Sequence, residues 1–233
     1  MTPSTIAAFF DFDNTLLAGD GAKIGIRYMW ERGEVSWRYL LRVVSANTLF
    51  KRNWLSAERM GRILLTFYKG QPLSKFESEA DEYYRTYIKP RLAPTPLARL
   101  EAHRRAGHVL VLLTGSVRYL MTPVVRDLGF HHLICTDLET DAGGILTGRT
   151  VREICVGDVK VRRARELAET VGIDLTHSYA YGDHVSDLPL LESVGHPFVV
   201  EPQLALRRHA ETRGWPILSF DLSAKSPPSS PMI

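Results

Sequence analysis

The chain has 233 residues, of which 45% are hydrophobic and 24% are charged. It is long enough for one large domain, or for one core with a smaller insert. Its net charge of +3 is small and dispersed and gives no indication of nucleic-acid binding. No uncharged apolar stretch approaches about 18 residues, and no basic region precedes the first apolar run, so we expect a soluble, cytoplasmic protein without stable membrane insertion. Composition does not indicate the oligomeric state.

The first predicted strand, residues 6–10, is followed by two carboxylates. Along an extended chain, alternation sends Asp11 and Asp13 to one face and Phe10 and Phe12 to the other. Two acids at the end of a buried strand are costly unless a cation lies between them. The segment therefore predicts a metal site or proton-transfer chemistry.

Residues 22–89 have apolar side chains near helical spacing and no convincing strand pattern. Three prolines end this helical block, at Pro90, Pro94 and Pro96. A helix over 96–106 follows, with Gly107 as its stop, and then a continuous apolar strand over 108–113.

The rest of the chain alternates strands and helices: helix 118–128, strand 132–135, a hairpin turning at 142–144, helix 158–171, strand 179–181, helix 186–193, strand 198–200, helix 203–212 and strand 215–218. Such alternation predicts an α/β fold with right-handed crossovers and a mainly parallel sheet. The helical block is then an insertion. We expect a core made of residues 1–17 and 90–222, a helical cap at 18–89, and a disordered tail at 223–233, which is rich in Pro and Ser.

Polar residues end several predicted strands, and ligands of open α/β sheets bind at the carboxyl ends of strands. Thr114-Gly115-Ser116 follows strand 108–113, Lys160 lies in the first turn of a helix, and Gly182-Asp183 and Asp187 follow strand 179–181. Carboxylates of this kind suit Mg²⁺. A lysine, a hydroxyl and backbone N–H groups suit a phosphate group.

Four segments, Asp11-Phe-Asp13-Asn-Thr15, Thr114, Lys160 and Gly182-Asp183-x-x-x-Asp187, resemble in type and order the four motifs of the haloacid dehalogenase (HAD) superfamily. The helical block is similar to the C1-type cap of the phosphoserine-phosphatase-like branch, subfamily IB. The resemblance covers about residues 5–220. It implies a three-layer Rossmann-like parallel sheet core with an inserted all-helical C1-type cap, and an enzyme of the phosphoric monoester hydrolase class.

The resemblance also implies roles for the two strand-end acids. Asp11 is the expected nucleophile, which would form an aspartyl-phosphate. Asp13 is the expected general acid toward the leaving oxygen and then the general base on water. The presence of Asp13 favours a phosphatase or phosphotransferase over a dehalogenase or an ATPase of the superfamily.

The remaining roles concern metal and phosphate. The implied Mg²⁺ ligands are Asp11, Asp183 and the main-chain carbonyl of Asp13, and Asp187 would orient the metal shell or Lys160 from outside. Phosphoryl oxygens would be bound by the following groups: Thr114, Lys160, the Gly115 N–H and Ser186.

The segment Gly19-Asp20-Gly21-Ala-Lys-Ile-Gly25 is a glycine-rich turn between a strand and a helix, which suggests a dinucleotide fingerprint. Its spacing is G-x-G-x-x-x-G, and no acidic residue ends a second strand about 20 positions on, so we expect a hinge between core and cap instead. Asp20 stands about where phosphoserine phosphatases place a glutamate for the substrate amine. Thr114-Gly-Ser116 replaces their usual Ser-Gly-Gly, so phosphoserine itself is not assigned.

The first functional hypothesis is a Mg²⁺-dependent phosphatase of a small phosphomonoester. A rival within the enzyme class is a phosphatase of a bulkier or amphipathic phosphate ester, such as a lysophospholipid, because the cap is rich in aromatic residues and arginines. A third hypothesis, from another class, is a catalytically silent phosphate-sensing or protein-binding module. The full set of four motifs argues against the third.

Overall fold

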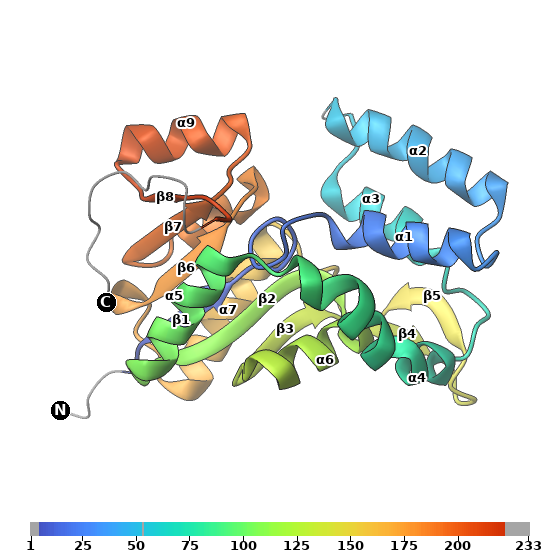
Figure 1. Ribbon diagram of the computed structural model, residues 1–233, viewed down its shortest axis with the longest axis horizontal. Helices are drawn as coiled ribbons and strands as arrows, with labels where there is room; N and C mark the ends of the chain where they lie inside the picture. The colour runs from blue at the N-terminus through green and yellow to red at the C-terminus, as the bar shows by residue number, and fades with distance from the viewer. Residues whose placement is uncertain (1–4, 53, 222–233) are drawn as a thin grey trace.

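A computed structural model describes residues 5–52 and 54–221, so the predicted tail at 223–233 lies outside the described residues. The centre of the molecule is a parallel six-stranded sheet in the order β3-β2-β1-β6-β7-β8 (Figure 1). Its strands are β1 (Ala7–Phe10), β2 (Val109–Val117), β3 (His132–Thr136), β6 (Tyr179–Gly182), β7 (His196–Val200) and β8 (Ile217–Leu218). The prediction of an α/β fold with a parallel sheet is confirmed.

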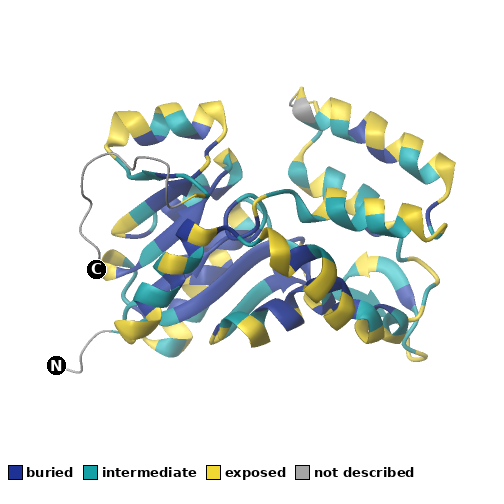
Figure 2. Ribbon diagram, viewed as in Figure 1, coloured by how far each residue is buried: buried dark blue, intermediate teal, exposed yellow. Residues whose placement is uncertain are grey.

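Helices cover both faces of the sheet, which makes three layers. One face carries α5 (Pro94–Arg105) and α6 (Arg118–Leu128); the other carries α7 (Asp158–Val171), α8 (Leu188–Leu191) and α9 (Leu204–Arg213). Along β1, Ala8 and Phe10 face the first layer while Ala7 and Phe9 face the second. All four are fully buried, which explains why this strand is a continuous apolar run rather than an alternating one (Figure 2).

The insertion after β1 is helical, as the sequence predicted. It contains α1 (Gly21–Glu31), α2 (Trp37–Lys51), α3 (Ala57–Leu65), α4 (Leu73–Tyr83) and a π-helical turn, η1 (Tyr84–Ile88), followed by the 3₁₀ turn η2 (Lys89–Arg91). Asp20, Ser36 and Ser56 each cap a helix with a side-chain oxygen that accepts a backbone N–H. In Figure 1, α1, α2 and α3 form a lobe beside the sheet, and α2 is exposed along most of its length in Figure 2.

The two connections between core and insertion run side by side. The Ala18 N–H donates to the carbonyl of Arg91 (2.8 Å), and the Ala93 N–H donates to the carbonyl of Leu16 (2.8 Å). Leu17 and Leu92 form an isolated antiparallel bridge between these two segments. Both passages between core and insertion are therefore held at one place, close to the acids that follow β1.

A hairpin of β4 (Leu138–Thr140) and β5 (Leu146–Thr150) supports the insertion from the core side. The Gly70 N–H donates to the carbonyl of Leu146 (2.8 Å), and the Leu73 N–H donates to the carbonyl of Gly144 (3.1 Å). Apolar side chains from the insertion, the hairpin, the end of β2, α6 and the segment after β5 form one cluster there: Leu65, Phe76, Ala80, Val117, Tyr119, Leu146 and Ile154. The C-terminal half of the insertion is thus packed on the core.

Two predicted elements differ from the structure. The strand expected to end at residue 113 continues to Val117, which pairs with Thr136 after a shift in register, so Thr114 lies inside β2 rather than after it. The helix expected over 186–193 is a 3₁₀ turn, η4 (Val185–Asp187), followed by the four-residue α8. Pro189 accounts for part of this difference because it lacks an N–H for the preceding turn. Among the helices of the described residues, none is long and apolar enough to cross a membrane.

Candidate active site

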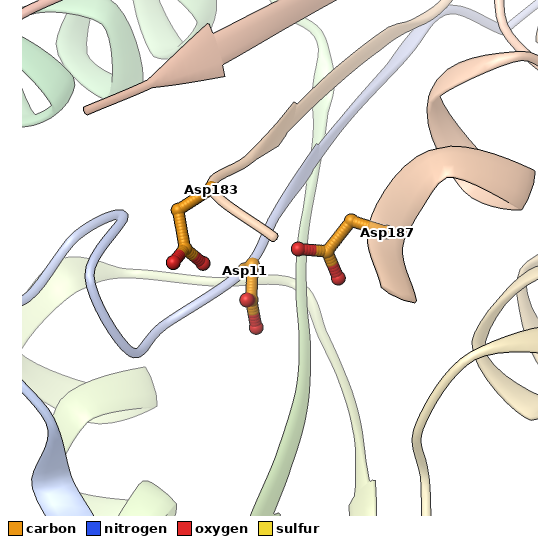
Figure 3. Close-up of side chains that lie close together, drawn as sticks. All are labelled: Asp11, Asp183 and Asp187. Atoms are coloured by element: carbon orange, nitrogen blue, oxygen red, sulfur yellow. The ribbon is translucent and has the colours of Figure 1, made fainter. Parts of the chain in front are cut away.

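Three buried carboxylates meet at the carboxyl end of the sheet (Figure 3). Asp11 follows β1, Asp183 follows β6, and Asp187 ends the η4 turn; each offers an oxygen within 4.8 Å of the others. Their exposed fractions are 7%, 4% and 1%. We call these three residues the carboxylate cluster. Acids brought this close together while shielded from water repel one another unless a cation is present.

The local backbone explains why these acids meet. The Asp11 N–H donates to the carbonyl of Tyr181 (3.0 Å), which extends the pairing of β1 with β6 and places Asp11 beside Gly182. A Cβ added at Gly182 would lie 2.8 Å from the Cβ of Asp187, so only glycine allows the η4 turn to fold back this closely. The Asp187 carboxylate in turn accepts the His184 N–H (3.2 Å) and caps the turn.

Lys160, in the first turn of α7, supplies one cation to the carboxylate cluster. Its Nζ lies 2.8 Å from Oδ1 of Asp11 and 2.6 Å from Oδ1 of Asp187, and the residue is 4% exposed. Burial alone would lower the pKa of Lys160, but the two carboxylates outweigh burial and raise it. The two carboxylates therefore favour the charged form of Lys160, which lies between Asp11 and Asp187.

One lysine does not balance three carboxylates. Burial raises the pKa of Asp183 to about 9, and the neighbouring charges of Asp11 and Asp187 add to that rise. Burial also raises the pKa of Asp11 to about 7 although Lys160 opposes the shift. Among the described residues, no side chain or backbone N–H donates to the Asp183 carboxylate. An excess of buried oxygen ligands is the chemistry that a hard divalent cation such as Mg²⁺ fits, so the cluster can hold such an ion.

Asp13 is in a different environment from Asp11. Its Oδ1 accepts the Gly21 N–H (2.6 Å) and its Oδ2 accepts the Ser116 hydroxyl (3.0 Å). Both carboxylate oxygens of Asp13 are thus engaged by neighbouring donors. Burial raises the pKa of Asp13, although the two hydrogen bonds oppose the shift. Burial therefore makes Asp13 a weaker acid than an exposed aspartate.

The motifs do not predict the two partners of Asp13. In the sequence, Ser116 is part of a polar segment and Gly21 is part of an expected hinge. The structure gives Gly21 a second requirement, because an added Cβ would lie 2.7 Å from Oδ1 of Asp13. The glycine-rich spacing after Asp13 was the available sequence signal for this close approach.

The remaining predicted site residues make contacts of their own outside the carboxylate cluster. Thr114 is fully buried in β2, and its Oγ1 accepts the Ser116 N–H (3.1 Å). The Gly115 carbonyl accepts the Thr136 hydroxyl (2.7 Å), which holds this part of β2 in place. Ser186 lies in η4, where its hydroxyl is 2.9 Å from Nδ1 of His184. Asp20 is the N-cap of α1 and forms an ion pair with Lys23 (2.9 Å).

Fold and site together define a class: an α/β protein with a parallel sheet, in which a strand-end aspartate is paired with a buried lysine and lies beside further carboxylates. A sequence model of the haloacid dehalogenase-like hydrolase family matches residues 8–192. The chain therefore belongs to the haloacid dehalogenase-like hydrolase family.

Relatives of known name are similar over most of their length. Phosphoserine phosphatase SerB1 of Mycobacterium tuberculosis is 31% identical over 226 residues, which cover 95% of this chain and 73% of that protein. Histidinol-phosphatase of Neisseria meningitidis is 28% identical over 221 residues, which cover 91% and 98%. Family and relatives confirm the prediction of a phosphatase-type enzyme of this superfamily.

Solved structures agree with the fold. A Bordetella pertussis Tohama I protein of unknown function has a TM-score of 0.84 and 28% identity, covering 94% of this chain and all of that one. A phosphoserine phosphatase solved as a phospho-aspartyl intermediate analogue has a TM-score of 0.69 and 18% identity, covering 94% of each chain. The predicted likeness of the fold to phosphoserine phosphatases is confirmed.

Proposed function

We propose that this protein is a Mg²⁺-dependent phosphatase that hydrolyses a small phosphomonoester through an aspartyl-phosphate on Asp11. The observation that carries the proposal is the different placement of the two acids after β1. Asp11 lies in the carboxylate cluster beside Lys160, whereas Asp13 is held by Gly21 and Ser116. Two neighbouring carboxylates with separate environments can take separate roles in one reaction.

Asp11 has the position of a nucleophile. Lys160, 2.8 Å away, favours its ionised form and opposes the effect of burial on its pKa. In the first step an Asp11 oxygen bonds to phosphorus while the bond from phosphorus to the ester oxygen breaks. In the second step water attacks the phosphorus, and the aspartyl-phosphate bond breaks to release phosphate and restore Asp11.

Asp13 handles the protons of both steps. Its raised pKa allows it to donate a proton to the departing ester oxygen, and as a carboxylate it then accepts a proton from the attacking water. The hydrogen bonds from Gly21 and Ser116 hold its carboxyl group in one orientation. A fixed orientation matters because proton transfer needs hydrogen-bond reach to the reacting oxygen.

Mg²⁺ would be held by Asp11, Asp183 and the Asp13 carbonyl. When bound, the ion supplies positive charge that offsets the charge of the phosphoryl oxygens. Asp187 positions Lys160 through a 2.6 Å ion pair and so acts from outside the ligand set. We assign phosphoryl binding to Thr114, the Gly115 N–H, Lys160 and Ser186, and we retain Asp20 as a candidate for a substrate amine.

We also propose that residues 18–89 act as a cap that closes over the site, with residues 1–17 and 90–222 as the core. Support comes from the paired connections at Leu17 and Leu92 and from the bond between Asp13 and Gly21, which links the catalytic acid to the start of α1. The tip of α2 also reaches the catalytic end, where the rings of Phe50 and His184 lie 6.4 Å apart. Closure of such a cap would exclude water from the reaction.

The test compares Asp11→Asn with Asp158→Asn, which changes an exposed acid in the first turn of α7. Asp11→Asn should lower kcat by at least on the order of 10⁴-fold while the unfolding midpoint stays within the native range. Asp158→Asn should keep both turnover and Mg²⁺ dependence. Retained Mg²⁺-dependent turnover in Asp11→Asn would disprove the nucleophile assignment.

The native chain and the Asp11→Asn variant also distinguish an enzyme from a catalytically silent module. Steady turnover of a generic ester, together with fluoroberyllate capture by the native chain and none by Asp11→Asn, excludes a module that only binds phosphate. Absence of turnover for every ester with intact phosphate binding would favour the module.

A second candidate, a phosphatase of a bulkier or amphipathic ester, is favoured by the exposed apolar face of α2. Trp37, Leu41 and Val44 are 64%, 59% and 61% exposed on that helix. Binding to anionic vesicles, with faster turnover of a lysophospholipid phosphate than of soluble esters, would select this candidate. Ranking by kcat/KM should include phosphoserine and histidinol phosphate, the esters suggested by the names of the two relatives.

A further inference from the structure

A cavity of about 290 Å³ lies between the insertion and the catalytic end of the core. Its wall includes Asp13 and Ser116 at the core and then follows α1, α3 and α4 into the insertion. We call it the cap cavity. Its volume is near the lower end of the range for small-molecule sites, roughly 300–1,000 Å³. The proposed proton donor thus faces a space large enough for a compact leaving group.

The wall of the cap cavity is mostly apolar. It is formed in large part by side chains such as Met29, Met60, Leu64, Phe67, Phe76 and Ile154. Within residues 5–52 and 54–221, no lysine, arginine or histidine lines it, and Asp13 and Glu79 are its acidic residues. Glu79 already accepts the Tyr28 hydroxyl (3.2 Å) and an Arg32 N–H (3.0 Å). An anionic leaving group would therefore be buried here without a cationic partner, which is unfavourable.

Tyr83 adds a polar group to this wall. The residue is 5% exposed, and its hydroxyl has no hydrogen-bond partner among the described residues. Burial raises the pKa of Tyr83, so the hydroxyl keeps its proton and remains a donor. The ring is fixed between Tyr28 and Tyr87, at centroid distances of 5.0 and 5.6 Å. A buried donor without a partner is costly in the free protein, and Tyr83 is one of the residues that line the cavity.

We propose that the cap cavity binds the leaving group of the substrate, and that this group is an alcohol with a compact apolar body, a neutral polar atom that accepts the Tyr83 hydroxyl, and no carboxylate. The inference rests on the proposed function, because it assumes that Asp13 protonates an oxygen at the mouth of this cavity. Leaving groups would then be selected both by the apolar wall of the cavity and by the lack of a cation among its described residues. Free serine, which carries a carboxylate, does not belong to this class.

The first experiment measures kcat/KM for two pairs of esters with the native chain. 4-Methylphenyl phosphate should exceed 4-carboxyphenyl phosphate by at least about tenfold, and cyclohexyl phosphate should exceed methyl phosphate by a similar factor. Equal values, or a preference for the carboxylate or the methyl ester, would overturn the inference and leave the phosphatase proposal intact. If none of the four esters is hydrolysed, the proposed function fails and the inference fails with it.

A second experiment places a cation in the wall. Met60→Arg should raise the ratio of 4-carboxyphenyl to 4-methylphenyl phosphate turnover by at least about tenfold, because the carboxylate gains a partner. Leu41→Arg is the matched control, since Leu41 is 59% exposed on α2 and does not line the cavity. A ratio that is unchanged in a Met60→Arg protein with native circular dichroism, or changed equally in both variants, would contradict the assignment of the cavity.

Tyr83→Phe tests the donor, with Tyr87→Phe as control. Loss of an unpartnered hydroxyl should leave the unfolding midpoint unchanged or higher, while kcat/KM for 4-(hydroxymethyl)phenyl phosphate falls about fivefold relative to 4-methylphenyl phosphate. Tyr87→Phe should alter neither value. An equal change for both esters in Tyr83→Phe would show that the hydroxyl does not contact the leaving group.

Discussion

The carboxylate cluster and the cap cavity lie on either side of Asp13 and have opposite chemistry. The cluster gathers Asp11, Asp183 and Asp187 around the Lys160 ammonium, all nearly inaccessible to water. The cavity wall is apolar, and no basic side chain of the described residues lines it. Under the proposed function, the contrast means that the reacting phosphate and the departing alcohol would be recognised by different forces: charge on one side, and size with lack of charge on the other.

The difference has a physical basis. A phosphate group is the same in every monoester and always carries negative charge, so cations and N–H donors can be fixed in advance for it. Leaving groups vary, and an apolar wall discriminates among them through size and through the cost of burying an unpaired charge. Asp13 lines the cap cavity and connects the insertion with the core, because it contacts Gly21 of the insertion and Ser116 of β2.

Among the changes that test the contrast between the two regions, replacing Asp13 is expected to have the largest effect. Asp13→Asn should lower kcat about 10²- to 10⁴-fold for an alkyl phosphate and markedly less for 4-nitrophenyl phosphate, whose leaving group needs no proton. Ser116→Ala keeps the acid and removes one of its hydrogen bonds, so its loss should be about tenfold or smaller. Steady-state kinetics with both esters measure these values. An equal loss for the two esters would show that Asp13 is not the proton donor.

Replacing Lys160 tests whether its positive charge stabilises the carboxylate cluster. Lys160→Met leaves Asp11 and Asp187 buried without their shared partner, so stability should fall by about 3–5 kcal/mol. Lys75→Met removes the ion pair with Glu34, whose members are 33% and 18% exposed, and should cost about 1 kcal/mol or less. Urea denaturation of metal-free protein measures both. Similar losses for the two variants would contradict the special role of the buried pair.

A smaller effect on stability, which depends on pH, should come from His103. Its pKa shows the effect of burial where no opposite charge opposes it. His103 is inaccessible to solvent and bonds Tyr181 (2.8 Å) and His108 (2.9 Å). Burial, with the nearby His108 and Arg99, lowers its pKa from 6.5 to about 3. Lys160 is buried too, yet its carboxylate partners reverse the direction of its shift.

The sign for His103 follows from proton binding. Between pH 6.5 and about 3 the unfolded chain binds a proton that the folded chain does not, so stability falls as pH decreases through that window. The slope contributed by His103 should be up to about 1.4 kcal/mol per pH unit. Urea titrations at pH 7, 6 and 5 measure the free energy of unfolding of the native chain and of His103→Gln. The difference between the two isolates the contribution of His103. A difference that does not change with pH would show that His103 is not held neutral.

Much of the catalytic end could be inferred from the sequence because its signals are local. Each of Asp11, Lys160 and Asp183 ends or begins an element whose apolar pattern is unambiguous, and parallel strands bring such positions to one edge. The predictions that differ from the structure concern the extent of single elements. The continuation of β2 through Thr114 depends on pairing of Val117 with Thr136, and the short α8 depends on a turn that Asp187 caps.

By itself, the sequence determined the α/β class, the helical insertion after the first strand and the acids and lysine of the catalytic end. Tertiary structure alone decided that both oxygens of Asp13 are engaged, and that a cavity without a cationic wall among the described residues lies beside it. The reason is physical: periodicity and motif order depend on neighbours along the chain, whereas a cavity is formed by side chains from several helices whose packing no local pattern encodes. Tyr83 looks like one more aromatic residue of a helix until the fold shows its hydroxyl buried without a partner.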